Sequence, residues 1–168
     1  MERIEWMEKY MANAERLMYE NRVEEGLHLL NDLLYDEPGY GNLHNYLGWA
    51  YLYYTADIAR AELHLKMAIR FDREYAPPYQ HMGYLLNRNG KYVEAIEYFR
   101  AGLTKNGANR VALLEGIATA YELKNEYALA IRTLKEAAKA SAADGEVNRL
   151  MAGIKRCRRK RLALFFTL

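Results

Sequence analysis

Apolar residues recur along this chain at the i, i+3, i+4 and i+7 spacing that is typical of amphipathic helices. Small residues recur in step with that pattern. One small column holds Ala14, Gly48, Gly83 and Ala118, at spacings of 34, 35 and 35, and a second holds Gly26, Ala61, Ala95 and Ala130. Two large columns share the period: Leu30, Leu65, Phe99 and Leu134, and Leu17, Tyr51, Leu86 and Tyr121. The pattern predicts a repeated helical hairpin, whose small residues let two helices approach closely.

Turn residues separate the predicted helices. Within hairpins the turns fall at residues 20–22, 55–57, 87–91 and 124–126, and between hairpins at 36–39, 72–74 and 105–109. Gly90 is the clearest helix end, because glycine takes the left-handed conformation readily. Pro77 and Pro78 suit the first turn of a helix, where a missing N–H costs little.

These columns resemble the tetratricopeptide repeat family. The matching motifs are L-G-x-x-Y, ending at Tyr51, and G-K-Y-x-x-A-I-x-x-F, starting at Gly90. The resemblance implies an all-α fold, a right-handed superhelix (α-solenoid) of about four helical hairpins. We expect the repeats at about residues 7–40, 41–75, 76–110 and 111–144, a capping helix at about 145–161 and an apolar tail at 162–168. Residues 1–161 are expected to form a single domain.

The predicted capping helix carries four apolar residues at helical spacing: Val147, Leu150, Met151 and Ile154. A solenoid needs such a terminal helix, with one polar face, to cover its last apolar surface.

Composition narrows the possible functions. The 51% of apolar residues excludes a disordered chain, and the single Cys157 excludes an intramolecular disulfide and a cysteine zinc cage. Arginines around Cys157 would lower its thiol pKa, although an incidental residue of the capping helix is the favoured interpretation. Four histidines without a metal-binding motif are expected to be solvated or hydrogen-bonded. We therefore expect no enzyme activity, cofactor or metal.

In the resembled family, the first helix of each hairpin lines a concave groove. By that resemblance the peptide-binding groove here would hold Tyr19, Asn45, Tyr46, Trp49, Tyr53, Gln80, His81, Tyr84 and Arg88, together with Met11, Glu15, Asn42, Asn87, Glu115, Thr119 and Glu122. Aromatic side chains beside amides give large contact area and polar groups for a peptide backbone. Of the 15 tyrosines, Tyr10 is among those assigned to core columns, and Tyr54 and Tyr75 are among those assigned to outer positions or repeat ends. The alternative is that the groove aromatics only pack between hairpins.

Some members of the family clamp the acidic C-terminal tails of chaperones with lysine, asparagine and arginine. The corresponding positions here are Met11, Glu15, Tyr46, Pro77 and His81. None of them matches, so an acidic chaperone tail is not an expected partner, and an acidic peptide would meet Glu15, Glu115 and Glu122.

The net charge of +2 conceals an uneven distribution, because six cations lie within residues 155–161 and leave −4 for the rest. These cations could complement the helix dipole, dock a protein, or anchor the chain to an anionic membrane. The candidate anchor is Arg158, Arg159, Lys160, Arg161, Phe165 and Phe166. Nucleic acid is a weaker candidate partner.

The sequence thus predicts a non-enzymatic protein-interaction module or assembly scaffold that binds a peptide or helix of a partner. One alternative is a dedicated substrate chaperone resembling the repeat chaperones of type III secretion. Another is a membrane-peripheral assembly factor that uses the tail. Self-association through exposed ends is also expected. No secretory signal or membrane span is recognisable, which predicts a cytoplasmic protein.

Overall fold

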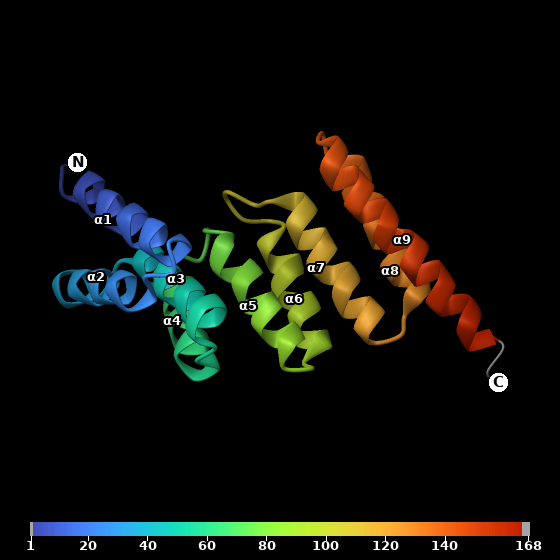
Figure 1. Ribbon diagram of the computed structural model, residues 1–168, viewed down its shortest axis with the longest axis horizontal. Coiled ribbons are helices and arrows are strands. Elements are labelled where there is room, and N and C mark those ends of the chain that lie inside the picture. Colours follow the sequence, from blue (N-terminus) through green and yellow to red (C-terminus); the bar gives the residue numbers. More distant parts are fainter. Residues whose placement is uncertain (1, 166–168) are drawn as a thin grey trace. The chain divides into compact units, whose positions relative to one another are not determined.

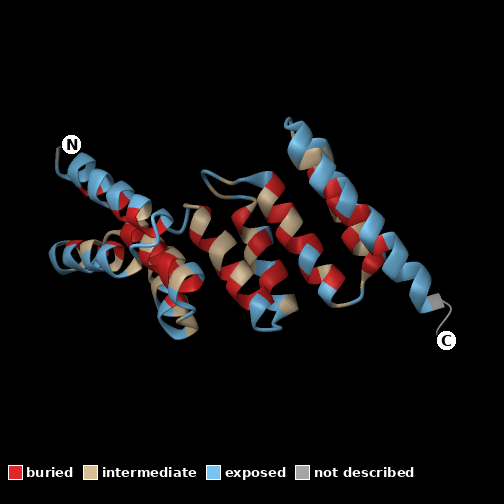
Figure 2. Cartoon of the chain, viewed as in Figure 1, coloured by how far each residue is buried: buried red, intermediate tan, exposed pale blue. Residues whose placement is uncertain are grey.

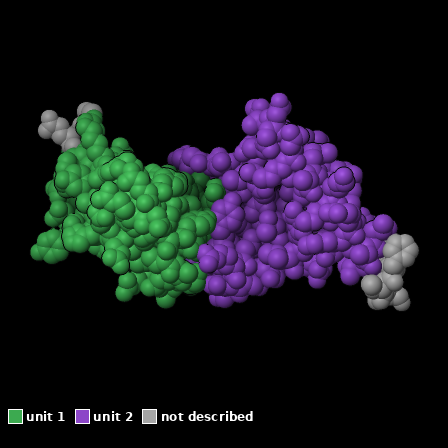
Figure 3. Space-filling model, viewed as in Figure 1, with its two compact units in different colours: residues 1–81 green, residues 82–168 purple. Residues whose placement is uncertain are grey.

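The computed structural model describes residues 2–165, and the side chains of residues 3–164. Over that range the chain forms nine α-helices and one π-helical turn, and no β-strand. The chain divides into two compact units, with the boundary between His81 and Met82 (Figure 3).

Unit 1 consists of two helical hairpins and the start of a third (Figure 1). Its elements are α1 (Glu2–Tyr19), α2 (Val23–Asp36), α3 (Gly41–Ala50), the π-helical turn η1 (Tyr51–Thr55) and α4 (Ile58–Phe71). Helix α1 packs against α2, α3 packs against α4, and α3 also contacts both α1 and α2.

Helix α5 (Pro77–Arg88) begins in unit 1 and ends in unit 2. The remaining elements of unit 2 are α6 (Tyr92–Gly102), α7 (Arg110–Leu123), α8 (Tyr127–Ala140) and α9 (Asp144–Phe165). Helix α7 packs between α6 and α8, and α9 packs on α8.

Each of the four hairpins turns at a residue in the left-handed conformation. These residues are Asn21 (φ 62°), Ala56 (φ 57°), Gly90 (φ 76°) and Asn125 (φ 63°). Asparagine and glycine tolerate this region, and in three turns the next N–H reaches back to a carbonyl five residues earlier, as from Arg22 to Leu17 at 2.8 Å. The four turns predicted within hairpins are therefore confirmed. Ala56, which is neither asparagine nor glycine, follows the π-helical turn.

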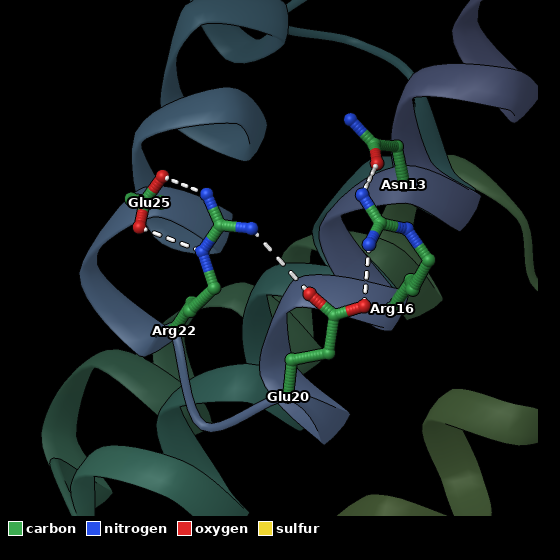
Figure 4. A network of polar contacts seen from close by, with 5 residues as sticks. All are labelled: Asn13, Arg16, Glu20, Arg22 and Glu25. Carbon is green, nitrogen blue, oxygen red and sulfur yellow. Dashed lines mark hydrogen bonds and ion pairs between the residues drawn. The ribbon is translucent and has the colours of Figure 1, made fainter.

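Charged side chains reinforce the turn between α1 and α2 (Figure 4). Glu20 accepts from Arg16 and from Arg22, and Arg22 also holds Glu25 through two hydrogen bonds of 2.6 and 2.8 Å. Arg22 lowers the pKa of the Glu25 carboxyl. The network lies at the surface. Because its charged groups already pair with one another, it needs no ligand.

Two glycines of the first small column, Gly48 and Gly83, lie directly against large side chains of the neighbouring helix, which agrees with the close helix approach that the sequence predicts. A Cβ placed on Gly83 or on Gly116 would lie 2.5 Å from the ring of Phe99, and one on Gly48 would lie 2.7 Å from the side chain of Leu65. Real side chains do not approach so closely, so only glycine lets these helices pack at the observed distance. Phe99 is fully buried between Gly83 of α5 and Gly116 of α7.

We expect Gly116→Ala to lower the free energy of unfolding by about 1–3 kcal/mol, because the added methyl overpacks the site against the Phe99 ring. Combining it with Phe99→Leu should relieve the clash and recover part of the loss. Gly145→Ala is the matched control, since nothing lies within 4 Å of a Cβ there. Chemical denaturation followed by circular dichroism measures all three variants. Equal stability of the Gly116 and Gly145 variants would show that the close approach is not required.

Two histidines connect α3 and α4 inside unit 1. His44 is buried, and its Nε2 lies 2.9 Å from the carbonyl oxygen of Pro38, so Nε2–H donates there. Nδ1 of His44 lies 3.0 Å from Nδ1 of His64, so the two rings share a hydrogen bond. Burial, and then the charges of His44 and Arg60, lower the pKa of His64 to about 4, so His64 is neutral at physiological pH. This pair holds a hairpin together and offers no open coordination site.

Helix α9 covers the last hairpin, and its two faces differ in burial (Figure 2). Leu150, Ile154 and Cys157 are buried, while Met151 is 52% exposed. The expectation that Met151 belongs to the apolar face is therefore wrong, and Cys157 takes the next inward position instead. Helix α9 also runs to Phe165, four residues beyond the predicted end of the cap.

Candidate functional site

A pocket in unit 1 lies between α1, α3 and the start of α5. Its volume is about 250 Å³, and its lining consists of Glu15, Asn45, Tyr46, Trp49, Tyr75 and His81. We refer to it as the unit 1 pocket. Among the predicted groove residues, it brings together Glu15 from α1, three residues from α3, and His81 from α5.

Trp49 is the centre of an aromatic cluster at this pocket. The ring centroids of Tyr54, Tyr19 and Tyr46 lie 5.1, 6.0 and 6.2 Å from that of Trp49, and all three meet it edge-on. Edge-on pairs at this separation stabilise one another beyond their buried area. The cluster holds Trp49 half-buried, and Tyr19 is 71% exposed beside it.

The π-helical turn places Tyr54 in the cluster. Trp49 and Tyr54 are five residues apart, a spacing that lies far from one face of an α-helix but close to one face of a π-helix. The repeat register predicts Tyr54 and Tyr75 at outer positions or repeat ends, and the structure corrects both. No property of the sequence in isolation identifies the extra residue in this turn, so Tyr54 could not be assigned from repeat spacing.

Two tyrosine hydroxyls face the carboxylate of Glu15. The hydroxyl of Tyr46 lies 3.4 Å from Oε2, and that of Tyr19 lies 3.4 Å from Oε1. Burial, and then the negative charge of Glu15, raise the pKa of Tyr46 to about 12, so its hydroxyl keeps its proton and donates. Both contacts are long for O–H···O hydrogen bonds, so they hold the carboxylate only loosely.

Two buried polar atoms of the pocket have no partner among the described residues. They are Oδ1 of Asn45, a residue that is 6% exposed, and Nδ1 of His81. Burial lowers the pKa of His81 to about 4, so the imidazole is neutral. A buried polar atom without a partner costs free energy, and a ligand that supplies the missing hydrogen bond recovers it.

Other predicted groove residues lie beside the unit 1 pocket or elsewhere. Tyr53 is 46% exposed and meets His81 edge-on at 5.8 Å. Gln80 is half-buried at the start of α5. Met11 is fully buried, so its expected place in the groove is wrong, and Tyr10, expected in the core, is 40% exposed.

In unit 2, predicted groove residues contact neighbouring helices. The hydroxyl of Tyr84 donates to the carbonyl of Ala112 at 3.3 Å, and its ring meets that of Phe99 edge-on at 5.2 Å. Asn87 is buried and donates from Nδ2 to the carbonyl of Gly116 at 3.2 Å. Arg88 and Thr119 are exposed. A ligand-binding role for Tyr84 and Arg88 stays a prediction.

The acidic groove residues of unit 2 are neutralised by α9. Arg149 donates to Glu115 at 2.8 Å, and Arg156 forms two hydrogen bonds of 2.7 and 2.8 Å with Glu122. Lys160 donates to the same carboxylate at 2.7 Å. Glu122 is buried, and hydrogen bonding from Arg156 is the largest of the effects that lower its pKa to about 2. The expectation that Glu115 and Glu122 present free acidic groups to a peptide is therefore wrong.

In the candidate anchor, too, one cation is paired with a carboxylate while others are exposed. Lys160 is held by Glu122, whereas Arg158, Arg159 and Arg161 are exposed on α9 near Leu162 and Leu164. The side chain of Phe165 and the whole of Phe166 lie outside the described residues.

Burial, and then the charge of Glu122, raise the pKa of the Cys157 thiol to about 11. The expected lowering by neighbouring arginines is wrong, because the buried position and the carboxylate outweigh Arg156 and Lys160. The thiol is thus protonated and enclosed, which fits a packing role.

We expect Glu122→Gln to weaken the docking of α9 by about 1–3 kcal/mol at neutral pH. The pKa of Glu122 in the folded state is about 2, below its ordinary value of 4.5. The carboxylate therefore stabilises the fold above about pH 4.5, and this contribution is lost as the pH falls through 2. Hydrogen exchange of α9 amides at pH 7 and pH 3 measures the effect. Glu94→Gln, on the exposed start of α6, is the control, and equal exchange in both variants would contradict the prediction.

Comparison with known proteins agrees with this architecture. A tetratricopeptide repeat family profile matches residues 86–154. Residues 86–154 carry the tetratricopeptide repeat pattern. The resemblance predicted from the sequence is thereby confirmed, as is the all-α solenoid of helical hairpins. Among curated proteins, none matches the sequence of this chain.

Three solved structures share the tetratricopeptide repeat fold over most of the chain. PilW, a widely conserved type IV pilus biogenesis factor, aligns with a TM-score of 0.77 at 14% identity, covering 96% of this chain and 79% of PilW. A thermophilic TPR protein of Thermus thermophilus aligns with a TM-score of 0.77 at 18% identity, covering 88% of this chain and 81% of that protein. A chain of the APC/C hetero-tetramer Cut9-Hcn1 aligns with a TM-score of 0.74 at 16% identity, covering 88% of this chain and 29% of the matched chain.

Within residues 2–165 neither a metal-binding cluster nor a membrane-spanning helix is present. No group of three or more His, Cys, Asp or Glu side chains there could hold a metal ion. No described helix is long and apolar enough to cross a membrane.

Proposed function

We propose that this chain is a non-enzymatic protein-interaction module, and that the unit 1 pocket binds an extended segment of a partner protein. The observation that carries the proposal is the combination of the aromatic cluster around the half-buried Trp49 with two buried polar atoms, on Asn45 and His81, that lack partners among the described residues.

Both halves of this combination suit a peptide. Large aromatic side chains that are already held in place lose little conformational freedom on binding, and they are enriched among the residues that carry most of the binding energy of interfaces. The free Oδ1 of Asn45 accepts from an N–H group, which every peptide backbone offers except at proline. A wholly apolar ligand would bury Asn45 without satisfying it, and so would bind less well.

The repeats support the same function at a coarser level. Chains of this fold occur in a pilus biogenesis factor and in the Cut9-Hcn1 hetero-tetramer, which is an assembly of proteins. Tetratricopeptide repeats act generally as protein-interaction and assembly modules. The pocket in unit 1 then gives this chain a place where a partner segment could be held.

Trp49→Ala should weaken binding of peptides selected from a random displayed library by at least about tenfold, because it removes the largest contact surface of the pocket. Fluorescence polarisation with the selected peptides measures the affinity, and circular dichroism checks helicity. Tyr19→Ala, which removes an exposed side chain, is a milder second variant.

Trp6→Ala is the matched control, since Trp6 is exposed on α1 outside the pocket and pairs with Tyr10. Unchanged affinity in the Trp49 and Tyr19 variants, with the fold preserved, would place the binding surface elsewhere.

A second proposed function concerns the end of α9, where three arginines and two leucines are exposed next to one another. Cations beside apolar side chains are typical of helices that lie on anionic membranes. This supports a membrane-peripheral role alongside protein binding.

Replacing Arg158, Arg159 and Arg161 with Gln should abolish flotation with vesicles that contain phosphatidylserine, because electrostatic attraction to the lipid is lost. Lys160 is left in place, since it pairs with Glu122. The control carries the same loss of charge at exposed positions elsewhere: Arg70→Gln, Lys91→Gln and Lys139→Gln. Equal flotation of both variants would rule out the anchor.

A further inference from the structure

The unpartnered polar atoms of the unit 1 pocket include an amide acceptor, and a carboxylate lies beside it. Oδ1 of Asn45 can only accept a hydrogen bond. Glu15 adds a negatively charged acceptor that lines the same pocket. Nδ1 of His81 belongs to a neutral ring, so it imposes no positive charge. The pocket therefore favours a ligand that donates hydrogen bonds.

Glu15 keeps most of its hydrogen-bonding capacity for such a ligand. A carboxylate accepts about four hydrogen bonds, and from the part of the chain that the structure describes Glu15 receives only the two long ones of 3.4 Å, from Tyr19 and Tyr46. Within the described residues no lysine, arginine or histidine forms an ion pair with it. Its field also acts on the hydroxyls of Tyr46 and Tyr54, and the field of Glu8 on Tyr46 and Tyr75. The carboxylates of α1 thus make this a locally negative, aromatic site.

Unit 2 of the same chain shows how these repeats satisfy such carboxylates. Glu115 and Glu122 lie on α7, and each receives an arginine from α9, Arg149 and Arg156 respectively. Glu115 and Glu122 are seven residues apart, and so are the two arginines. Among the described residues of unit 1, no arginine occupies the corresponding place beside Glu15.

We propose that the unit 1 pocket takes an arginine side chain of the partner segment, with the guanidinium paired to Glu15, donating to Oδ1 of Asn45 and lying against Trp49 and Tyr46. The proposal rests on the peptide-binding function above and specifies the chemistry of the bound segment.

The contents of the pocket favour arginine over other side chains. The guanidinium is planar, carries five N–H donors and stacks on aromatic rings, so one group can satisfy several separate acceptors and cover a ring. A lysine ammonium lacks the flat surface and is more strongly hydrated. An aspartate or glutamate would be repelled by Glu15, and an apolar side chain would leave Asn45 unsatisfied.

The experiment uses three acetylated and amidated peptides, Ala-Ala-X-Ala-Ala, in which X is arginine, lysine or citrulline. Citrulline has the shape of arginine without its charge. The chain has two tryptophans. In the full chain carrying Trp6→Phe, Trp49 is thus the sole tryptophan, so its fluorescence reports directly on the pocket.

We expect the arginine peptide to change Trp49 fluorescence saturably and to bind at least about tenfold more tightly than the citrulline peptide, with lysine in between. Glu15→Gln should reduce arginine binding to the citrulline level. Glu94→Gln in unit 2 removes the same charge and should leave binding unchanged.

Several outcomes would overturn the arginine assignment. They are equal binding of the arginine and citrulline peptides, equal binding of arginine and lysine, no saturable change with the arginine peptide, or wild-type affinity in Glu15→Gln. Library-selected peptides that depend on Trp49 but contain no arginine would overturn it while leaving the peptide-binding function intact. Selected peptides that ignore Trp49 would instead remove the proposed function itself.

Discussion

Close approach of paired helices, made possible by glycine facing a large side chain, is the constraint on which this structure depends. Phe99 fills the space left by Gly83 and Gly116, and Leu65 fills the space left by Gly48. These contacts join residues 16 or 17 positions apart in the chain, and small and large residues recur in the same columns every 34 or 35 residues, which builds one hairpin after another. The turns repeat with the same period, each at a residue in the left-handed conformation, which is asparagine or glycine in three of the four turns.

This packing fixes the first helix of each hairpin and so decides which side chains can meet a ligand. In unit 2 the acidic side chains at those positions form ion pairs within the chain, because α9 supplies arginines to Glu115 and Glu122 and covers the last hairpin. In unit 1 the positions are left with a negative charge at Glu15 and with buried polar atoms, Oδ1 of Asn45 and Nδ1 of His81, that have no partner within the described part of the chain. The contrast between satisfied and unsatisfied polar groups distinguishes a cap from a candidate binding site more clearly than sequence position does.

Much of the fold can be predicted because its determinants are local or periodic. The columns that contain Gly48 and Leu65, together with the turn at Gly90, are sufficient to predict the hairpins and their order. The site is harder. The repeat register predicts that Asn45, Tyr46, Trp49 and His81 belong to the site. It does not predict Tyr75 in the pocket or Tyr54 in the aromatic cluster. It also places Met11 at the groove, where the structure buries it, since the first hairpin packs its methionines inward.

The amino-acid sequence by itself determined the helices, their pairing and the contrast between the basic segment 155–161 and the acidic remainder of the chain, because these follow from spacing and residue type. Only the tertiary structure decided which charges remain available. Lys160 and Arg156 are paired with Glu122, while the pocket carboxylate of Glu15 has no cation among the described residues. It also placed Tyr54 against Trp49 through a π-helical turn. The charge pairing depends on distances between groups that are remote in the chain, and the position of Tyr54 depends on one extra residue in a turn. A periodic pattern encodes neither.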